Sequence, residues 1–246
     1  MRFALKPEIL ALLDLDRLEV VSGSFVDEIF ARSFADILYR IPFKNREESA
    51  MIFVLIELKT NSYKFTVKQC IKYVFGVWEN ALTNVTQDAN ADGVTKAKKQ
   101  KLRTFKFPMV LPIVLHSGEK PFTASLQLVD LVETIEGLEA YVPNMRIMLI
   151  DLADPQQESK PEDFNLAILF MTLRAVHSKD VVDKLMEIYQ TLKPTMHLES
   201  SRQEWYDALC YAATSSPYLS RADFTNIKEK TKLEFEGVDN MSPTLL

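Results

Sequence analysis

The sequence predicts an α/β protein, with a mixed central sheet flanked by helices and a helical C-terminal region. Three observations favour this fold class. Two runs rich in Ile, Val, Phe, Tyr and Leu flank a polar segment, as the strands of a hairpin do. Two later apolar runs are typical of buried strands. After residue 161, apolar residues recur at helical spacing. We therefore expect a sheet domain over 1–155 and a helical region, packed on it, over 156–246.

Composition excludes several classes of protein. The 246 residues are 47% hydrophobic and 26% charged, with a net charge of −5, as in an ordinary globular protein. Glycine is scarce, and no glycine-rich phosphate loop occurs, which speaks against an organic nucleotide cofactor. Two cysteines form neither a disulfide framework nor a zinc pattern. Without a membrane-length apolar run or a signal-peptide core, a cytoplasmic protein is expected, and its oligomeric state, including a homodimer, stays open.

The first elements surround a turn. Leu10–Val21 mixes apolar and acidic positions and is expected to enter the core as a short helix or strand. The Ser22–Ser24 stretch is a turn signal. Asp27 or Glu28 could add an acid to a site, but a solvated turn is the favoured interpretation.

The predicted hairpin carries a cluster of charges. Its strands are Asp36–Ile41 and Met51–Leu58, and antiparallel pairing would bring Asp36 and Glu57 together. Glu57 and Lys59 are two positions apart, so on a strand they share a face. Two carboxylates can hold Mg²⁺, and a nearby lysine can orient a water or stabilise charge on a phosphate. The alternative is that these are strand-end charges that reach solvent.

A helix is predicted next, over Thr66–Leu82. Gln69 and Tyr73 are four residues apart and share a second face of it. The expected apolar face is formed by Val67, Ile71, Val74, Phe75, Trp78 and Leu82.

Lysines give this segment a positive surface. Lys64, Lys68 and Lys72 follow one another every four residues, and no acid occurs between Leu58 and Trp78. On an acidic protein, such a stripe is a candidate contact for the phosphate backbone of DNA, although a plain solvated helix face fits equally well. The polar segment Asn84–Arg103 is expected to be a flexible loop. The six basic residues between positions 96 and 106 form either a second DNA-contacting patch or a solubilising loop.

The second half alternates strands and helices. Phe107–Leu115 and Met145–Asp151 are expected as strands in the middle of the sheet, with a helix over Leu126–Glu136 between them. His116 could be a base or a phosphate contact, but a structural role is favoured. The expected C-terminal helices are Phe164–Val176, Val181–Leu192 and Arg202–Ala212, then a further helix and a tail within Leu219–Leu246.

Three segments resemble a known family. They are GSFVDEIFARSFADILYRIP, VLIELKTNS and FPMVLPIVLHSGEKPF, and they are similar to the recombination-promoting nuclease (Rpn, YhgA-like) transposase family of the PD-(D/E)xK nuclease superfamily. The resemblance implies a restriction-endonuclease-like sheet, with Asp36 as the metal-binding acid and Glu57 and Lys59 as the (D/E)xK pair. Gln69 and Tyr73 are similar to an auxiliary motif whose Gln lies near the active-site carboxylates. Ala35 stands where the motif has proline, and many members have Gln in place of Lys59.

The resulting hypothesis is a metal-dependent DNA endonuclease that hydrolyses phosphodiester bonds. Asp36 and Glu57 would bind Mg²⁺, Lys59 would position or activate the attacking water, and Gln69 would orient the site. The resemblance links this activity to DNA recombination or mobile elements. Members of the family usually have a longer helical segment upstream, and early acids there often assist the metal. The alternative is therefore a catalytically inactive, nuclease-like module that binds DNA or protein.

Overall fold

The structure is a computed structural model that describes residues 7–21, 37–44, 51–90, 100, 102–154 and 164–231. The chain divides into two compact units. The sheet unit contains Met1–His116 and Thr123–Ile150, and the helical unit contains Ser117–Phe122 and Asp151–Leu246. The packing of the helical region on the sheet domain stays a prediction.

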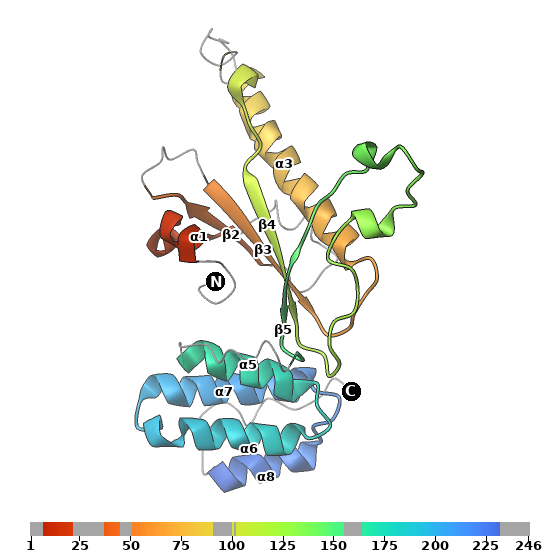
Figure 1. The fold of residues 1–246 in the computed structure, drawn as a ribbon. Coiled ribbons are helices and arrows are strands. Elements are labelled where there is room, and N and C mark those ends of the chain that lie inside the picture. Colours follow the sequence, from red (N-terminus) through yellow and green to blue (C-terminus); the bar gives the residue numbers. More distant parts are fainter. Residues whose placement is uncertain are drawn as a thin grey trace. The chain divides into compact units, whose positions relative to one another are not determined.

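The sheet unit is a mixed α/β structure built around one sheet (Figure 1). The order of its described strands is β1-β2-β3-β4-β5. β1 pairs antiparallel with β2, β2 antiparallel with β3, and β3 parallel with β4. The described elements are α1 (Pro7–Leu12), η1 (Leu15–Arg17), β1 (Glu19–Val20), β2 (Ile37–Pro42), β3 (Met51–Lys59), α3 (Thr66–Asn90), β4 (Met109–His116), η2 (Val129–Leu131), η3 (Glu139–Tyr141) and β5 (Met148–Asp151).

The pairing confirms the predicted hairpin and the mixed sheet, and it corrects one expectation. β2 and β3 pair in register from Ile37 opposite Ile56 to Pro42 opposite Met51. β4 lies between β3 and β5, in the middle of the sheet, as expected for its apolar run. β5 does not, because it is the last strand of the order. Its apolar Met148 and Ile150 are only half-buried and pack against one face of the sheet, so a continuous apolar run did not require a central position.

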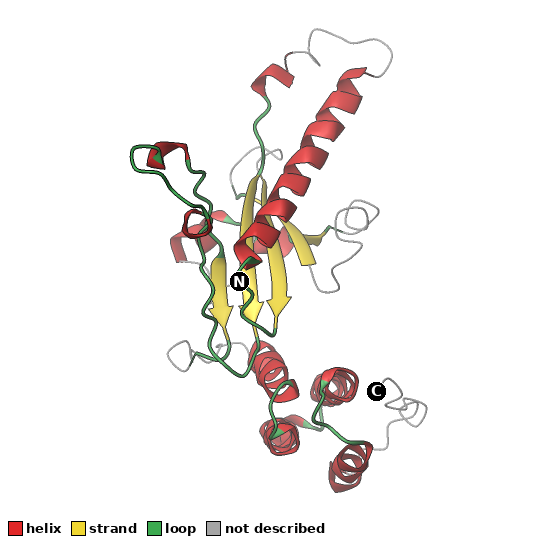
Figure 2. Ribbon diagram, turned by 90° about the vertical axis from the view of Figure 1, so that its right-hand side faces the viewer, coloured by secondary structure: helices red, strands yellow, loops and turns green. Residues whose placement is uncertain are grey.

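Both faces of the sheet are covered. On one face, the fully buried Leu13, Ile41 and Ile113 form a cluster against which Leu10 and Leu15 pack. On the other face lies α3, which runs along the sheet as Figures 1 and 2 show. Its buried hydrophobic residues are Val67, Cys70, Ile71, Tyr73, Val74 and Val77. Burying these apolar side chains between helix and strands is the main force that holds α3 in place.

Two predictions about α3 are wrong in part. Phe75 and Leu82, assigned to its apolar face, are 52% and 37% exposed, and Cys70 and Val77 are buried instead. The helix also continues past Leu82 to Asn90, so residues 84–90 are helical and not part of a loop. Helix propagation adds one hydrogen bond per residue without a new nucleation cost, which explains how a polar sequence can extend an established helix.

The helix expected over Leu126–Glu136 is absent from the structure. Only the short η2 is helical there, and Val132 and Ile135 are exposed. The Leu128 amide donates to Met145 O at 2.9 Å, and the Ile147 amide donates to Leu126 O at 3.0 Å. The backbone groups of Leu126 and Leu128 thus pair with residues 145–147. The Leu126 carbonyl is therefore not free for the first bond of a helix that begins at Leu126.

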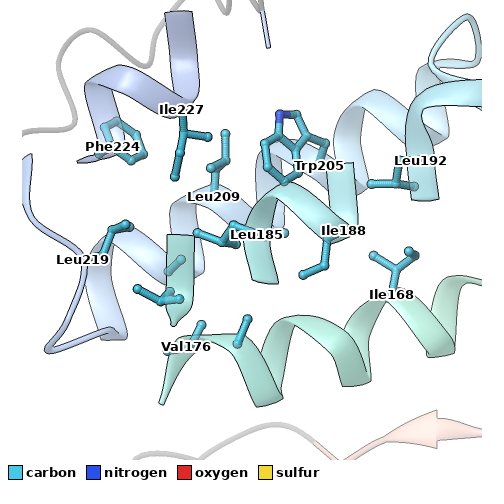
Figure 3. Close-up of a cluster of buried hydrophobic side chains, with 14 residues drawn as sticks. Ile168, Val176, Leu185, Ile188, Leu192, Trp205, Leu209, Leu219, Phe224 and Ile227 are labelled. Atoms are coloured by element: carbon cyan, nitrogen blue, oxygen red, sulfur yellow. The ribbon is translucent and has the colours of Figure 1, made fainter. Parts of the chain in front are cut away.

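The helical unit buries its own apolar core (Figure 3). Trp205, Leu185, Ile188 and Leu192 are fully buried in it. Its described elements are α5 (Phe164–Val176), α6 (Val181–Leu192), η5 (Lys193–Thr195), α7 (Glu199–Ser215) and α8 (Arg221–Thr231). The bounds of α5 and α6 are the predicted ones, α7 is longer at both ends, and α8 is the expected further helix. None of the described helices is long and apolar enough to cross a membrane.

Candidate active site

The candidate site lies where β3 ends. Lys59 is the last residue of β3 and is half-buried. Its Cα pairs in parallel register with that of His116, the last residue of β4. Residues paired in this way point to the same side of a sheet. Lys59 and the 1% exposed His116 therefore share the face on which α3 lies.

A chain of hydrogen bonds joins this strand end to α3. The Lys59 Nζ donates to Gln69 Oε1 at 3.0 Å, and the Gln69 Nε2 donates to Tyr73 Oη at 2.8 Å. Gln69 and Tyr73 are neighbours on α3 because they are four residues apart. The two bonds fix the orientation of the Gln69 amide, since its oxygen faces the ammonium group and its nitrogen faces the phenol. A bond to a charged donor is also stronger than a neutral one, so Lys59 is held in a defined position.

The helix begins in a way that supports this contact. The Thr66 amide and Oγ1 both donate to Tyr63 O, at 3.0 and 2.7 Å, and Gln69 N donates to Phe65 O at 3.1 Å. The turn after β3 is thereby tied to the first turn of α3. Ser62 Oγ in the same turn accepts from Thr123 N at 2.9 Å. The segment between Lys59 and Gln69 is therefore anchored at both ends, which positions the two side chains.

Of the two proposed metal ligands, only Glu57 belongs to a described strand. Asp36 is outside the described residues, as are Asp27 and Glu28. Glu57 belongs to β3, where its Cα pairs with that of Val114. The convergence of Asp36, Glu57 and Lys59 thus stays a prediction. Within the described part of the chain, no group of three or more His, Cys, Asp or Glu side chains could hold a metal ion.

The predicted lysine stripe needs one correction. Lys68 and Lys72 are exposed on α3, but Lys64 lies in the turn before the helix. Its Nζ is 5.5 Å from the centre of the Phe65 ring. The spacing of four residues therefore aligns only Lys68 and Lys72 on the helix. Lys64 still lies in the same segment and is exposed.

Sequence reasoning missed an aromatic cluster next to this stripe. Phe75 contacts Trp78 edge-on with ring centres 5.4 Å apart, and Trp78 stacks on Phe107 at 5.2 Å. Phe105 contacts Phe107 edge-on at 5.4 Å. The sequence pattern assigns Phe75 and Trp78 to a buried helix face and Phe107 to a buried strand, yet Phe75 and Phe107 are about half-exposed. The alternation of Phe105 and Phe107 around Lys106 was the available signal for a surface position.

The fold and this strand-end site define a class, namely a mixed α/β protein in which a lysine at the end of a sheet strand is held by the next helix. The chain belongs to the family described as "Putative transposase, YhgA-like", whose model matches residues 1–203. This confirms the resemblance seen in the sequence. The chain is also similar to the recombination-promoting nuclease RpnA of Escherichia coli (strain K12), with 28% identity over 129 residues. That match covers 52% of this chain and 37% of the relative's length. No solved structure matches the chain significantly.

Proposed function

We propose that this chain is a magnesium-dependent DNA endonuclease of the PD-(D/E)xK type, which acts in DNA recombination or in the movement of mobile elements. The observation that carries the proposal is the hydrogen bond between Lys59 at the end of β3 and Gln69 on α3. A lysine fixed in this way is suited to stabilise charge on a phosphate. The family and the relative's name support a nuclease, and a restriction-endonuclease-like fold is part of the same proposal.

Asp36 and Glu57 are the residues that would hold the metal. In the register of β2 and β3, Ile37 lies opposite Ile56. Asp36 precedes Ile37 in the sequence and Glu57 follows Ile56, so the same antiparallel register, continued by one residue, would place Asp36 opposite Glu57. A pair of carboxylates is the donor set that Mg²⁺ prefers. When bound there, the metal would polarise a phosphoryl oxygen and lower the pKa of a bound water.

Lys59 would act on the same phosphate. Its ammonium group can orient the attacking water and offset the negative charge that develops on the phosphoryl oxygens. Gln69 acts through Lys59, because its Oε1 accepts the 3.0 Å bond that keeps Nζ in place. We assign Gln69 and Tyr73 as positioning residues, with Tyr73 setting which way the Gln69 amide faces.

DNA would approach along α3. Lys68 and Lys72 are exposed on the helix that contributes Gln69, and Lys64 precedes them in the turn. These cations can hold backbone phosphates beside the proposed metal site. Electrostatic contact of this kind positions the duplex without reading its sequence.

A plasmid-nicking assay tests the function. The full chain is expected to convert supercoiled plasmid to nicked and linear forms with Mg²⁺ and not with EDTA. Asp36→Asn, which removes a charge with little change in size, should abolish cleavage while retaining DNA binding. Cleavage by Asp36→Asn at the parental rate would refute the assigned site. A parental protein that binds plasmid but never cuts it would instead favour the inactive binding module.

A further inference from the structure

Two aromatic rings flank two exposed lysines along the first part of α3 and the residue before it. Lys68, Lys72 and Phe75 are spaced by four and three residues on α3, which places them in one row, and Phe65 directly precedes the helix at the start of this row. We call this row the α3 stripe. All four residues are exposed, the two rings by 41% and 52%. With a rise of 1.5 Å per residue, the part of the stripe from Lys68 to Phe75 is about 10 Å long.

The stripe ends in a platform of aromatic rings. This platform consists of Phe75, Trp78, Phe105 and Phe107, whose consecutive ring centres are 5.2–5.4 Å apart. Trp78 is fixed by a 2.9 Å hydrogen bond from its Nε1 to Pro108 O. This bond orients the Trp78 ring, while Phe75 and Phe107 expose half of their surface.

Basic residues lie near the rings in the sequence. Lys72 precedes Phe75 by one helical turn, and Arg103 and Lys106 lie exposed beside Phe105 and Phe107. The first acid after the stripe is Glu79, one turn beyond Phe75. Lysine is depleted from the cores of protein–protein interfaces, whereas rings set among cations are the combination that binds unpaired nucleic acid.

We infer that the α3 stripe and its platform bind a single-stranded stretch of nucleic acid. Bases stack on Phe65, Phe75 and Phe107, and Lys68 and Lys72 hold the phosphates between them. The strand then runs along the helix that supplies Gln69, toward Lys59. The course of the strand toward Lys59 rests on the proposed nuclease function. Together, the two proposals name a substrate class for the nuclease, namely DNA with unpaired segments.

Fluorescence of Trp78 reports binding at the platform, because its ring contacts both Phe75 and Phe107. The chain has two tryptophans, and the other, Trp205, is fully buried in the helical unit. Its Nε1 has no hydrogen-bond partner among the described residues, so Trp205→Phe removes an unsatisfied donor. We therefore expect the Trp205→Phe protein to fold, and Trp78 is then its single tryptophan. In this variant, without Mg²⁺, single-stranded oligo(dT) of about 16 nucleotides should quench Trp78 and bind more tightly than a blunt duplex of the same length.

Matched substitutions separate stacking from charge. Phe75→Leu and Phe107→Leu keep an apolar side chain but lose the ring plane, and each should weaken oligo(dT) binding by about five-fold or more while leaving duplex binding unchanged. Phe75→Tyr and Phe107→Tyr keep the plane and should bind as the parent does. Lys68→Ala and Lys72→Ala should weaken both probes and reduce the salt dependence for oligo(dT) by about 0.7 per phosphate.

Two results would overturn the inference. One is equal affinity for oligo(dT) and duplex together with inert leucine variants, which would leave the nuclease proposal standing and remove only the stacking surface. The other is a change of sedimentation coefficient in the leucine variants without loss of oligo(dT) binding, which would identify the platform as an interface between copies of the chain. Failure of the nuclease proposal would look different, because oligo(dT) binding would persist without any cleavage in Mg²⁺.

Discussion

The two tryptophans have different surroundings, one in each unit. Trp205 is fully buried among the helices of the helical unit, where the ring centres of Trp205 and Tyr189 are 5.3 Å apart. Trp78 belongs to a surface cluster of the sheet unit, stacked on a half-exposed Phe107. Aromatic residues thus hold together the core of one unit and form a surface on the other. We therefore predict that substitutions at Trp205 mainly affect stability, whereas substitutions in the surface cluster mainly affect the binding inferred above.

The largest expected effect is on stability. Trp205→Ala should lower the free energy of unfolding by about 3–5 kcal/mol, because a large cavity replaces the indole in a closed core. Trp78→Ala should cost clearly less, since its ring is only half-buried. Urea unfolding followed by circular dichroism measures both. Equal losses in the two variants would break the comparison.

The next effect is on rate. Lys59→Ala should reduce plasmid cleavage by about 10²–10³-fold with little change in DNA affinity, because the ammonium group acts on charge that develops in the transition state. Single-turnover cleavage and filter binding give the two quantities. Gln69→Glu is the matched variant, because it keeps an acceptor for Lys59 but loses the donor to Tyr73. The cleavage rate of Gln69→Glu should lie between those of Lys59→Ala and the parent. A loss of DNA affinity instead of cleavage rate would contradict the positioning role.

A smaller effect concerns DNA affinity. Reversing Lys64, Lys68 and Lys72 to glutamate should weaken duplex binding and lower the salt slope by about 0.9 for each phosphate that the variant no longer binds. The control reverses Lys179, Lys193 and Lys230, which are exposed on the helical unit, and so changes the net charge equally. If both triple variants bound duplex equally weakly, overall charge and not the α3 segment would explain binding.

The smallest effect is a pH dependence confined to the helical unit. Burial lowers the pKa of His177 below its usual 6.5, and Glu119 opposes this weakly. The unfolded chain therefore binds more protons, so stability is fully present above pH 6.5 and falls as the pH drops through that value. His177→Gln should flatten this dependence in urea midpoints measured from about pH 5 to pH 8. An unchanged profile would show that other groups titrate on unfolding.

Sequence patterns predicted best those elements that bury one face against neighbours close in the sequence. The bounds of α5 and α6 follow their apolar periodicity, because those helices pack in a closed core. The pattern failed for Leu126–Glu136, where long-range bonds to residues 145–147 hold the start of the segment extended. It also misassigned Phe75, since spacing alone cannot tell a ring in the core from a ring in a surface cluster.

The candidate site was predictable in part. The family resemblance pointed to Lys59 as part of the (D/E)xK pair and to Gln69 as a residue near the active-site carboxylates, while spacing placed Glu57 with Lys59 on one strand face and Gln69 with Tyr73 on one helix face. The bond between Lys59 and Gln69 could not be predicted, because it depends on the turn of residues 60–65 that brings α3 back over β3. The aromatic platform required the pairing of α3 with the segment before β4, a contact between residues about 30 positions apart in the sequence.

The length of α3 has a consequence for its motion. Through Thr86, its last buried residue is Val77, and the residues after it are partly or fully exposed. A helical stretch without tertiary support is only marginally stable in water. Backbone amides near Val67 should therefore exchange with deuterium slowly, and those beyond Leu82 much faster. Such a gradient would let the far end of α3 unwind and re-form repeatedly, while the end that contacts Lys59 opens only when the sheet itself unfolds.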